Sequence, residues 1–299
     1  NQFLALITKP VITVFHTVLP NPDEFLKATV LKISKSSDCL IVMTNYSLQL
    51  LISDYQISED KITVIPHGTH LVAHPDKAAL KERYQLTGKT VLSTFGLLSS
   101  GKSIETTLYA LPAIIKKYPD TLFLIIGKTH PSIVKQEGEK YRTMLQEKVT
   151  ELKIEEYVQF INYFLPLPVL LDYLQLTDVY LFTSIDPAQA VSGTFSYAIS
   201  CGCPVVSTPI PHACEVLEDD AGIIIDFGNE RQLSEAVIHL LANESLRKDI
   251  SSNGLHRMAS TAWENAAIAH AVLFERTSKN KILLQYNLPS INLEHIQKM

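Results

Sequence analysis

The segment from Gly96 to Ser103, GLLSSGKS, could hold phosphate groups. It fits the spacing G-x-x-x-x-G-K-[ST], in which backbone N–H groups cradle phosphates and the lysine ammonium neutralises their charge. An apolar run, TVLSTF, precedes the motif, and a helical pattern, SIETTLYALPAII, follows it. Because N–H groups, a helix dipole and a cation meet at such a turn, Gly96 and Lys102 are predicted to bind a diphosphate.

The same motif occurs in ATP and GTP hydrolases, which also need an aspartate at the end of an apolar strand to hold Mg²⁺. The next apolar run, TLFLIIG, ends in Gly127, and Asp186 lies beyond the end of VYLFT. Asp226 ends the run IIID, but only late in the chain. A Mg-dependent P-loop NTPase therefore remains an alternative, although no aspartate lies where such an enzyme needs it in the order of strands. A solvent-facing Lys102 on an ordinary turn is a second alternative.

A second set of polar residues lies in DPAQAVSGTFSYAISCGCPVVSTPIPHACEVL, residues 186–217. A helix is expected to begin near residues 191–194 and to end at Gly202. The residues Ser192, Gly193 and Thr194 would then offer N–H groups and two hydroxyls at a helix start, which is a second anion site. The alternative is that the two hydroxyls only cap the helix.

Short apolar runs and helical patterns alternate along the chain and must position these residues. The runs cover residues 11–15, 38–43, 61–66, 90–95, 121–127, 157–161, 178–183, 203–208 and 222–227. They are rich in Val, Ile and Leu and alternate little, which is typical of parallel strands buried on both faces. The order predicts an α/β fold with doubly wound sheets, whose ligands bind at the carboxyl ends of the strands.

A stretch without periodicity, PHGTHLVAHPDK, covers residues 66–77 and predicts a domain boundary. The predicted parts are a first domain over 1–70, a fuller domain over 71–262, a helix over 263–280 that returns toward the first domain, and a linker or tail over 281–299. The chain begins NQFLALITKP, without Met and at what reads as the end of a helix. The upstream part of the first domain is therefore expected to be absent from this sequence, and no targeting signal can be read.

Composition narrows the class of protein. Hydrophobic residues make up 46% and charged residues 19% of the chain, which indicates a folded globular protein. The net charge of −5 argues against nucleic acid as a partner, and no run of about 18 apolar residues predicts a membrane span. The four cysteines have no metal-binding spacing, so they are expected to be small buried apolar residues in a reducing cytosol.

Three segments in one order carry a family resemblance: VIPHG, FGLLSSGKSIETTLYALPAI and QAVSGTFSYAISCGCPVVSTP. Together they resemble the retaining GT-B glycosyltransferases of family 4, and within them the mannosyltransferase-like members. The similarity runs from about residue 10 to about residue 275. It implies two Rossmann-like domains facing a cleft, the first of them incomplete here, with a nucleotide-sugar donor and no metal.

The resemblance assigns the phosphate-binding residues. It makes Lys102 the ligand of the donor diphosphate, beside Gly96, and it places Ser192–Thr194 at the distal phosphate. Leu97 stands where the family usually has an arginine. The nucleotide base is expected near Lys128.

The resemblance also marks the sugar and ribose contacts. The family has two glutamates eight positions apart, the first near the sugar hydroxyls and the second near the ribose. Gln189 and Tyr197 occupy these positions here, so hydrogen-bonding groups remain but the charge is lost. His16, just after VITVF, resembles the cleft histidine close to the transferred sugar; a histidine satisfied by backbone groups is the alternative.

The predicted activity is the transfer of a mannose- or glucose-type hexose, with retention, from a GDP- or UDP-sugar to a hydroxyl of a carbohydrate or glycolipid acceptor. His16, Lys102 and Gln189 are the candidate catalytic residues, and no cofactor besides the donor substrate is expected. The expected location is cytoplasmic, with peripheral contact to the inner membrane face as one option. Two alternatives stay open: the Mg-dependent P-loop NTPase, and a non-catalytic module that binds a sugar nucleotide or a partner.

Overall fold

The computed structural model describes residue 3, residues 6–73 and residues 75–285, with side chains described as far as Lys279. The chain divides into two compact units. The first unit contains Asn1–Gly68 and Trp263–Met299, and the second contains Thr69–Ala262.

A three-stranded parallel sheet forms the centre of the first unit, in the order β1 (Ile12–Val14), β2 (Cys39–Val42), β3 (Ile62–Val64). Alternate residues of β2 face opposite sides of the sheet, as the pleat requires. Leu40 and Val42 join the apolar cluster with α2 (Glu24–Ser36) and α3 (Asn45–Ser53). Cys39 and Ile41 join another cluster with α13 (Trp263–Gln285). Helices on both faces explain why β2 reads as a continuous apolar run.

Six parallel strands form the sheet of the second unit, in the order β6-β5-β4-β7-β8-β9. Their bounds are β4 Thr90–Phe95, β5 Thr121–Ile126, β6 Val158–Ile161, β7 Val179–Phe182, β8 Val205–Ser207 and β9 Ile223–Ile224. Strands β5 and β6 extend the sheet on one side of β4, and β7 to β9 extend it on the other. The strand order therefore reverses between β4 and β7, and in open α/β sheets a ligand crevice forms at the carboxyl ends of such a pair.

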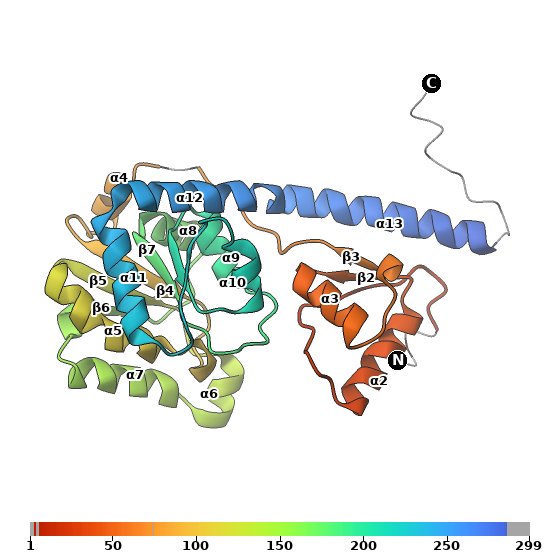
Figure 1. The fold of residues 1–299 in the computed structure, drawn as a ribbon, viewed down its shortest axis with the longest axis horizontal. Coiled ribbons are helices and arrows are strands. Elements are labelled where there is room, and N and C mark those ends of the chain that lie inside the picture. Colours follow the sequence, from red (N-terminus) through yellow and green to blue (C-terminus); the bar gives the residue numbers. More distant parts are fainter. Residues whose placement is uncertain (1–2, 4–5, 74, 286–299) are drawn as a thin grey trace, which may run out of the picture. The chain divides into compact units, whose positions relative to one another are not determined.

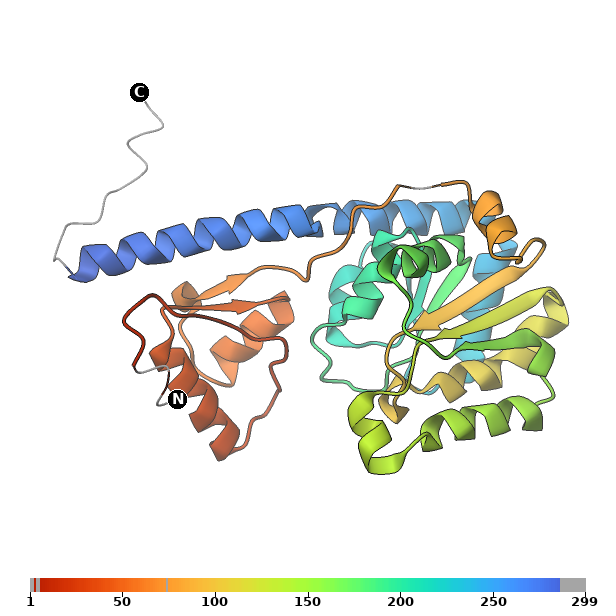
Figure 2. The same cartoon turned by 180° about the vertical axis from the view of Figure 1, so that it is seen from behind.

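Helices cover both faces of this sheet (Figures 1 and 2). Helices α5 (Ile104–Lys117), α7 (Lys140–Glu151) and α11 (Glu230–Ala242) contribute to one large apolar cluster with Leu92, Phe123 and Leu181. Helices α4 (Lys77–Arg83), α8 (Leu167–Leu176) and α9 (Gly193–Ser200) pack against the other face. The remaining helices are α6 Pro131–Glu137, α10 Pro211–Val216 and α12 Glu244–Met258, and 3₁₀ turns occupy Glu59–Lys61, Ser100–Lys102, Glu155–Tyr157 and Ala259–Thr261.

The structure confirms the predicted α/β class and finds a strand within each of the nine apolar runs. The units divide after Gly68 and Ala262, beside the predicted divisions at 70 and 262. Helix α13 belongs to the first unit and runs to Gln285, beyond the predicted end at 280. The rest of the predicted tail lies outside the described residues. Two features remain predictions: that the domains face a cleft, and that the first is incomplete. No helix in the described part of the chain is long and apolar enough to cross a membrane.

Candidate functional site

Gly96 brings the two predicted anion sites together at the carboxyl end of β4. Its φ of +128° is a backbone conformation that favours glycine. A Cβ atom at this position would lie 3.0 Å from Thr194 Cγ2 and 3.1 Å from Lys102 Nζ. The lysine ammonium and the start of α9 therefore flank one point, where the strand order reverses.

The Lys102 ammonium is poorly compensated. Among the described residues, none forms an ion pair or a hydrogen bond with Nζ, and the nearest aromatic face is that of Phe182, with its centroid 5.8 Å away. Burial lowers the pKa of Lys102 from 10.5 to about 8, because the charged form loses hydration. An anion bound at this point would compensate the charge and restore the pKa.

The segment after β7 fixes the backbone around Lys102. Thr183 Oγ1 donates a hydrogen bond to the Lys102 carbonyl at 2.8 Å. The Ile185 amide donates to the Gly101 carbonyl at 3.0 Å. The turn that carries the ammonium is thus tied to β7, the strand that leads toward α9.

The local geometry after Lys102 does not favour the NTPase. Lys102 ends a 3₁₀ turn, and α5 begins only at Ile104, after Ser103 in the left-handed region with φ of 45°. The Ser103 side chain is buried and shares a hydrogen bond of 2.9 Å with Thr106. The hydroxyl that would bind Mg²⁺ in an NTPase therefore has an internal partner.

The start of α9 offers two backbone N–H groups. Ser192 is the N-cap, and its Oγ accepts from the Phe195 amide at 3.3 Å. The Ser192 amide donates to His212 Nδ1 at 2.9 Å, so it already has a partner. The amides of Gly193 and Thr194 make no hydrogen bond within the described residues. Of the predicted anion site, only these two amides are therefore available to a ligand. The Ser192 hydroxyl caps the helix, which was the alternative stated for it.

His212 orients this helix start. The residue is 6% exposed, and its ring lies 5.2 Å from that of Phe195. Because Nδ1 accepts the Ser192 amide, the proton of the neutral imidazole is on Nε2. The structure places His212 against the N-cap of α9.

Gln189 and Tyr197 have partners within the second unit. Gln189 Oε1 accepts from Ser184 Oγ at 2.6 Å, and its Nε2 donates to the Val191 carbonyl at 3.4 Å. The Tyr197 hydroxyl lies 3.2 Å from His70 Nε2. The predicted contacts of Gln189 with a sugar hydroxyl and of Tyr197 with a ribose stay predictions.

A cavity of about 380 Å³ adjoins Gly96 and Thr194. The residues that line it are Phe95, Gly96, Leu97, Ile126, Gly127, Lys128, Tyr163, Phe164, Leu165, Leu167, Leu170, Thr194 and Tyr197. These residues end or follow β4, β5 and β6, or belong to α8 and α9. The cavity thus contains Lys128, where the base was expected, and lies next to the two amides and the ammonium.

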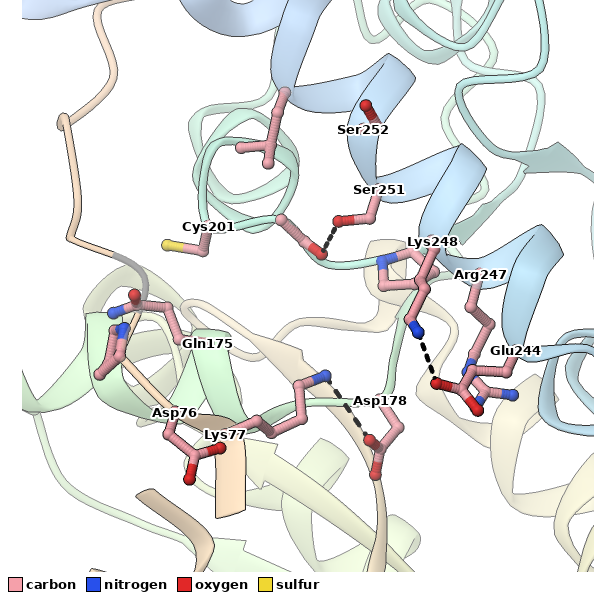
Figure 3. Close-up of a pocket in the computed structure, with 14 residues that line it drawn as sticks. Asp76, Lys77, Gln175, Asp178, Cys201, Glu244, Arg247, Lys248, Ser251 and Ser252 are labelled. Atoms are coloured by element: carbon pink, nitrogen blue, oxygen red, sulfur yellow. Dashed lines mark hydrogen bonds and ion pairs between the residues drawn. The ribbon is translucent and has the colours of Figure 1, made fainter. Parts of the chain in front are cut away.

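A larger cavity, of about 690 Å³, opens at the opposite edge of the same sheet, beside the starts of β7 and β8 (Figure 3). Both of its lysines are paired with carboxylates: Lys77 Nζ lies 3.5 Å from Asp178 Oδ1, and Lys248 Nζ lies 2.7 Å from Glu244 Oε1. The carboxyl edge, whose Lys102 ammonium has no ion pair among the described residues, is therefore the better candidate for an anionic ligand.

Adjacent residues on α7, missed in the sequence, brace the site. The Tyr141 hydroxyl accepts from the Ile104 amide at 2.8 Å and donates to Glu105 Oε2 at 2.7 Å. Arg142 Nη2 donates to the Gly127 carbonyl at 2.8 Å. Nothing in the helical pattern around these residues distinguishes them, since each bonds a backbone group far along the chain.

The other predictions from the sequence concern His16, the four cysteines and a metal site. His16 is exposed after β1 and belongs to the first unit, so its role stays a prediction. Cys39, Cys201 and Cys203 are buried as expected, but Cys214 is exposed, and the prediction for it was wrong. In the described part of the chain no three His, Cys, Asp or Glu side chains are grouped so as to hold a metal ion.

Two family profiles match the chain. That of "Glycosyl transferases group 1" matches residues 76–257, and that of "Glycosyltransferase Family 4" matches residues 2–72. The first match alone spans more than half of the chain and contains the whole candidate site.

Curated relatives share between 22% and 26% identity with the chain. The D-inositol 3-phosphate glycosyltransferase of Corynebacterium glutamicum is 22% identical over 82% of this chain and 59% of its own length. The GDP-mannose-dependent alpha-(1-6)-phosphatidylinositol monomannoside mannosyltransferase of Mycolicibacterium smegmatis is 24% identical over 75% of this chain and 58% of its own. The chain spans about three fifths of the length of these relatives.

Solved structures share the fold. Sucrose-phosphate synthase from Thermosynechococcus elongatus superposes with a TM-score of 0.77 at 19% identity, over 92% of this chain and 69% of that one. Anabaena HepE in complex with UDP-glucose superposes with a TM-score of 0.70 at 19% identity, over 88% of this chain and 72% of that one. The GT-B fold expected from the sequence is thereby confirmed.

Proposed function

Because the chain belongs to the group 1 glycosyl transferases, we propose that it binds a nucleotide diphosphate sugar at the carboxyl edge of the second sheet and transfers the sugar to an acceptor hydroxyl. One observation carries the proposal: the uncompensated Lys102 ammonium and the start of α9 flank Gly96. A diphosphate would receive the ammonium on one side and the amides of Gly193 and Thr194 on the other. The adjoining cavity would take the nucleoside.

The same groups would assist the chemical step. When the sugar–phosphate bond breaks, negative charge develops on the departing diphosphate. Lys102 and the positive end of α9 are already directed at that charge, so they would stabilise the transition state without reorganising. Thr183 and His212 would hold the two elements in place by the hydrogen bonds described above.

The finer assignments rest on resemblance. We propose a mannose- or glucose-type hexose, transferred with retention, and a carbohydrate or glycolipid acceptor. The names of relatives support this choice, since one is GDP-mannose-dependent and acts on a phosphatidylinositol mannoside, and a structural neighbour holds UDP-glucose. A glycolipid acceptor would bring the protein into peripheral contact with the cytoplasmic face of a membrane.

Calorimetric titration with UDP, GDP, UMP and GMP tests the binding step. We expect one diphosphate to bind at least about tenfold more tightly than its monophosphate, because charge-assisted hydrogen bonds to the second phosphate are lost in the latter. Equal affinities would contradict the proposal. Release of nucleotide from UDP-glucose or GDP-mannose in the presence of acceptor glycans tests turnover, and Mg-dependent ATP hydrolysis would instead support an NTPase.

A further inference from the structure

The cavity beside Gly96 is lined mainly by apolar and aromatic side chains. The ionisable residues among those described there are Lys128 and two tyrosines. Among the described residues that line it, none carries a carboxylate or a side-chain amide. The vicinal hydroxyls of a ribose donate hydrogen bonds best to carboxylates, so the cavity lacks the group that would recognise them most strongly.

Tyr197 lines the cavity beside the proposed diphosphate position. It follows Thr194 by one turn, so both side chains lie on one face of α9. Thr194 lies at the Lys102 end of the cavity, so Tyr197 is the next side chain along α9 from the diphosphate position. Its ring is stacked on Phe95, with centroids 6.4 Å apart and an angle of 24°, and its hydroxyl interacts with His70.

Two aromatic rings that line the cavity after β6 offer a place for the base. Tyr163 is 54% exposed and Phe164 is 84% exposed, although both are large and partly or wholly apolar. A planar base lying against them would cover this surface and gain the stacking that aromatic side chains give to every base.

Taking the proposed function as the premise, we infer that this chain holds its donor by the diphosphate and the base, and that the ribose hydroxyls contribute little. The diphosphate binds to Lys102 and the start of α9, and the base stacks in the aromatic cavity. The ribose lies against the ring of Tyr197 without a charged acceptor. The site therefore accepts the deoxyribonucleotide diphosphate nearly as well as the ribonucleotide.

The test is calorimetric titration of the full chain with UDP and 2′-deoxy-UDP, and with GDP and 2′-deoxy-GDP. A carboxylate that accepts from the ribose would make the ribonucleotide roughly tenfold to a hundredfold tighter, because hydrogen bonds to charged groups are strong. We expect less than about a fivefold difference for the base that binds, well below that range. A fivefold or larger preference for the ribonucleotide overturns the inference. Failure of both UDP and GDP to bind overturns the proposed function, and the inference with it.

Two substitutions of Tyr197 test whether the ribose lies beside it. Tyr197→Phe keeps the ring and removes the hydroxyl, and we expect the ratio of ribonucleotide to deoxyribonucleotide affinity to stay within about twofold of the ratio for the unchanged chain, since no charged hydrogen bond to the ribose is lost. A selective loss of ribonucleotide affinity in this variant would mean that the phenol reads the ribose. Tyr197→Glu supplies a carboxylate, and we expect it to raise the preference for the ribonucleotide to about tenfold or more. If it binds nucleotide with no such preference, the ribose does not lie beside residue 197.

Discussion

Tyr141 and Arg142 are neighbours on α7, yet they hold two different walls of the candidate site. Tyr141 accepts the amide of Ile104, the first residue of the helix that follows Lys102. Arg142 donates to the carbonyl of Gly127, which follows β5 and lines the cavity. Both side chains are buried, at 7% and 4% exposure. Helix α7 therefore ties the segment after Lys102 and one wall of the cavity to the same pair of residues.

Removing the Tyr141 hydroxyl should loosen this brace. In Tyr141→Phe the buried amide of Ile104 loses its partner, and Glu105 loses a donor. We expect the free energy of unfolding to fall by about 1–3 kcal/mol, the usual cost of leaving a buried donor unsatisfied. Urea denaturation followed by circular dichroism measures it.

The matched control is Tyr109→Phe on α5, whose ring is 43% exposed. It should change the free energy of unfolding by less than about 0.5 kcal/mol, as for other surface substitutions. Similar losses in the two variants would show that Tyr141 has no special structural role.

Much of the fold could be predicted because its strands and turns depend on residues that are close together in the sequence. The runs TVLSTF and TLFLII are strands at the positions expected, since unbroken apolar runs fit strands covered on both faces. The turn at Gly96 and the cap at Ser192 were also predictable, because a left-handed glycine and an N-cap serine depend on a few neighbouring residues.

Pairings between distant segments could not be predicted. No pattern in the sequence indicates that His212 accepts a hydrogen bond from the amide of Ser192, which removes that amide from the anion site. Nor did it reveal that the Tyr197 hydroxyl lies beside His70, since the two are 127 residues apart. Such contacts depend on how whole elements pack, and a motif records only residues that are close in the chain.

Lys102→Met should separate a binding role from a structural one. The substitution removes a half-buried ammonium that has no ion pair within the described residues. We expect affinity for the nucleoside diphosphate to fall at least about tenfold, because charge-assisted contacts are lost. The midpoint of thermal unfolding should stay the same or rise, since an unpaired charge no longer has to lose its hydration.

Lys148→Met on α7 is the control for this experiment, because that ammonium is paired with Glu151 at 2.7 Å near the surface. It should leave nucleotide affinity unchanged. Unaltered affinity in the Lys102 variant, measured by calorimetry, would remove Lys102 from the proposed site.

The lowered pKa of Lys102 predicts two opposite effects of pH. Above about pH 8 the ammonium of the unliganded protein loses its proton, so diphosphate affinity should fall toward tenfold per pH unit, whereas the phosphate, which titrates near pH 6, keeps its charge. Stability should change the other way. Between about 8 and 10.5 the unfolded chain binds more protons at this lysine than the folded chain, so its contribution to stability rises with pH.

Calorimetry and thermal unfolding across pH 7 to about 10 measure both slopes, and Lys102→Met supplies the baseline because it cannot titrate. Subtracting the two proteins isolates the effect of this lysine from that of other groups. If the difference in nucleotide affinity between the unchanged chain and Lys102→Met does not depend on pH, the Lys102 ammonium does not titrate in this range.

Gly96→Ala should close the site without unfolding the second unit. The new Cβ would lie 3.0 Å from Thr194 Cγ2 and 3.1 Å from Lys102 Nζ, in the space proposed for the diphosphate. It would also hold alanine at a φ of +128°, which costs about 1–3 kcal/mol of stability. Gly88→Ala separates these effects, because Gly88 also has a positive φ, +78°, but a Cβ there would meet no atom within 4 Å. We expect both variants to be less stable in urea denaturation and only Gly96→Ala to lose nucleotide binding. Equal nucleotide affinity in the two variants would place the diphosphate elsewhere.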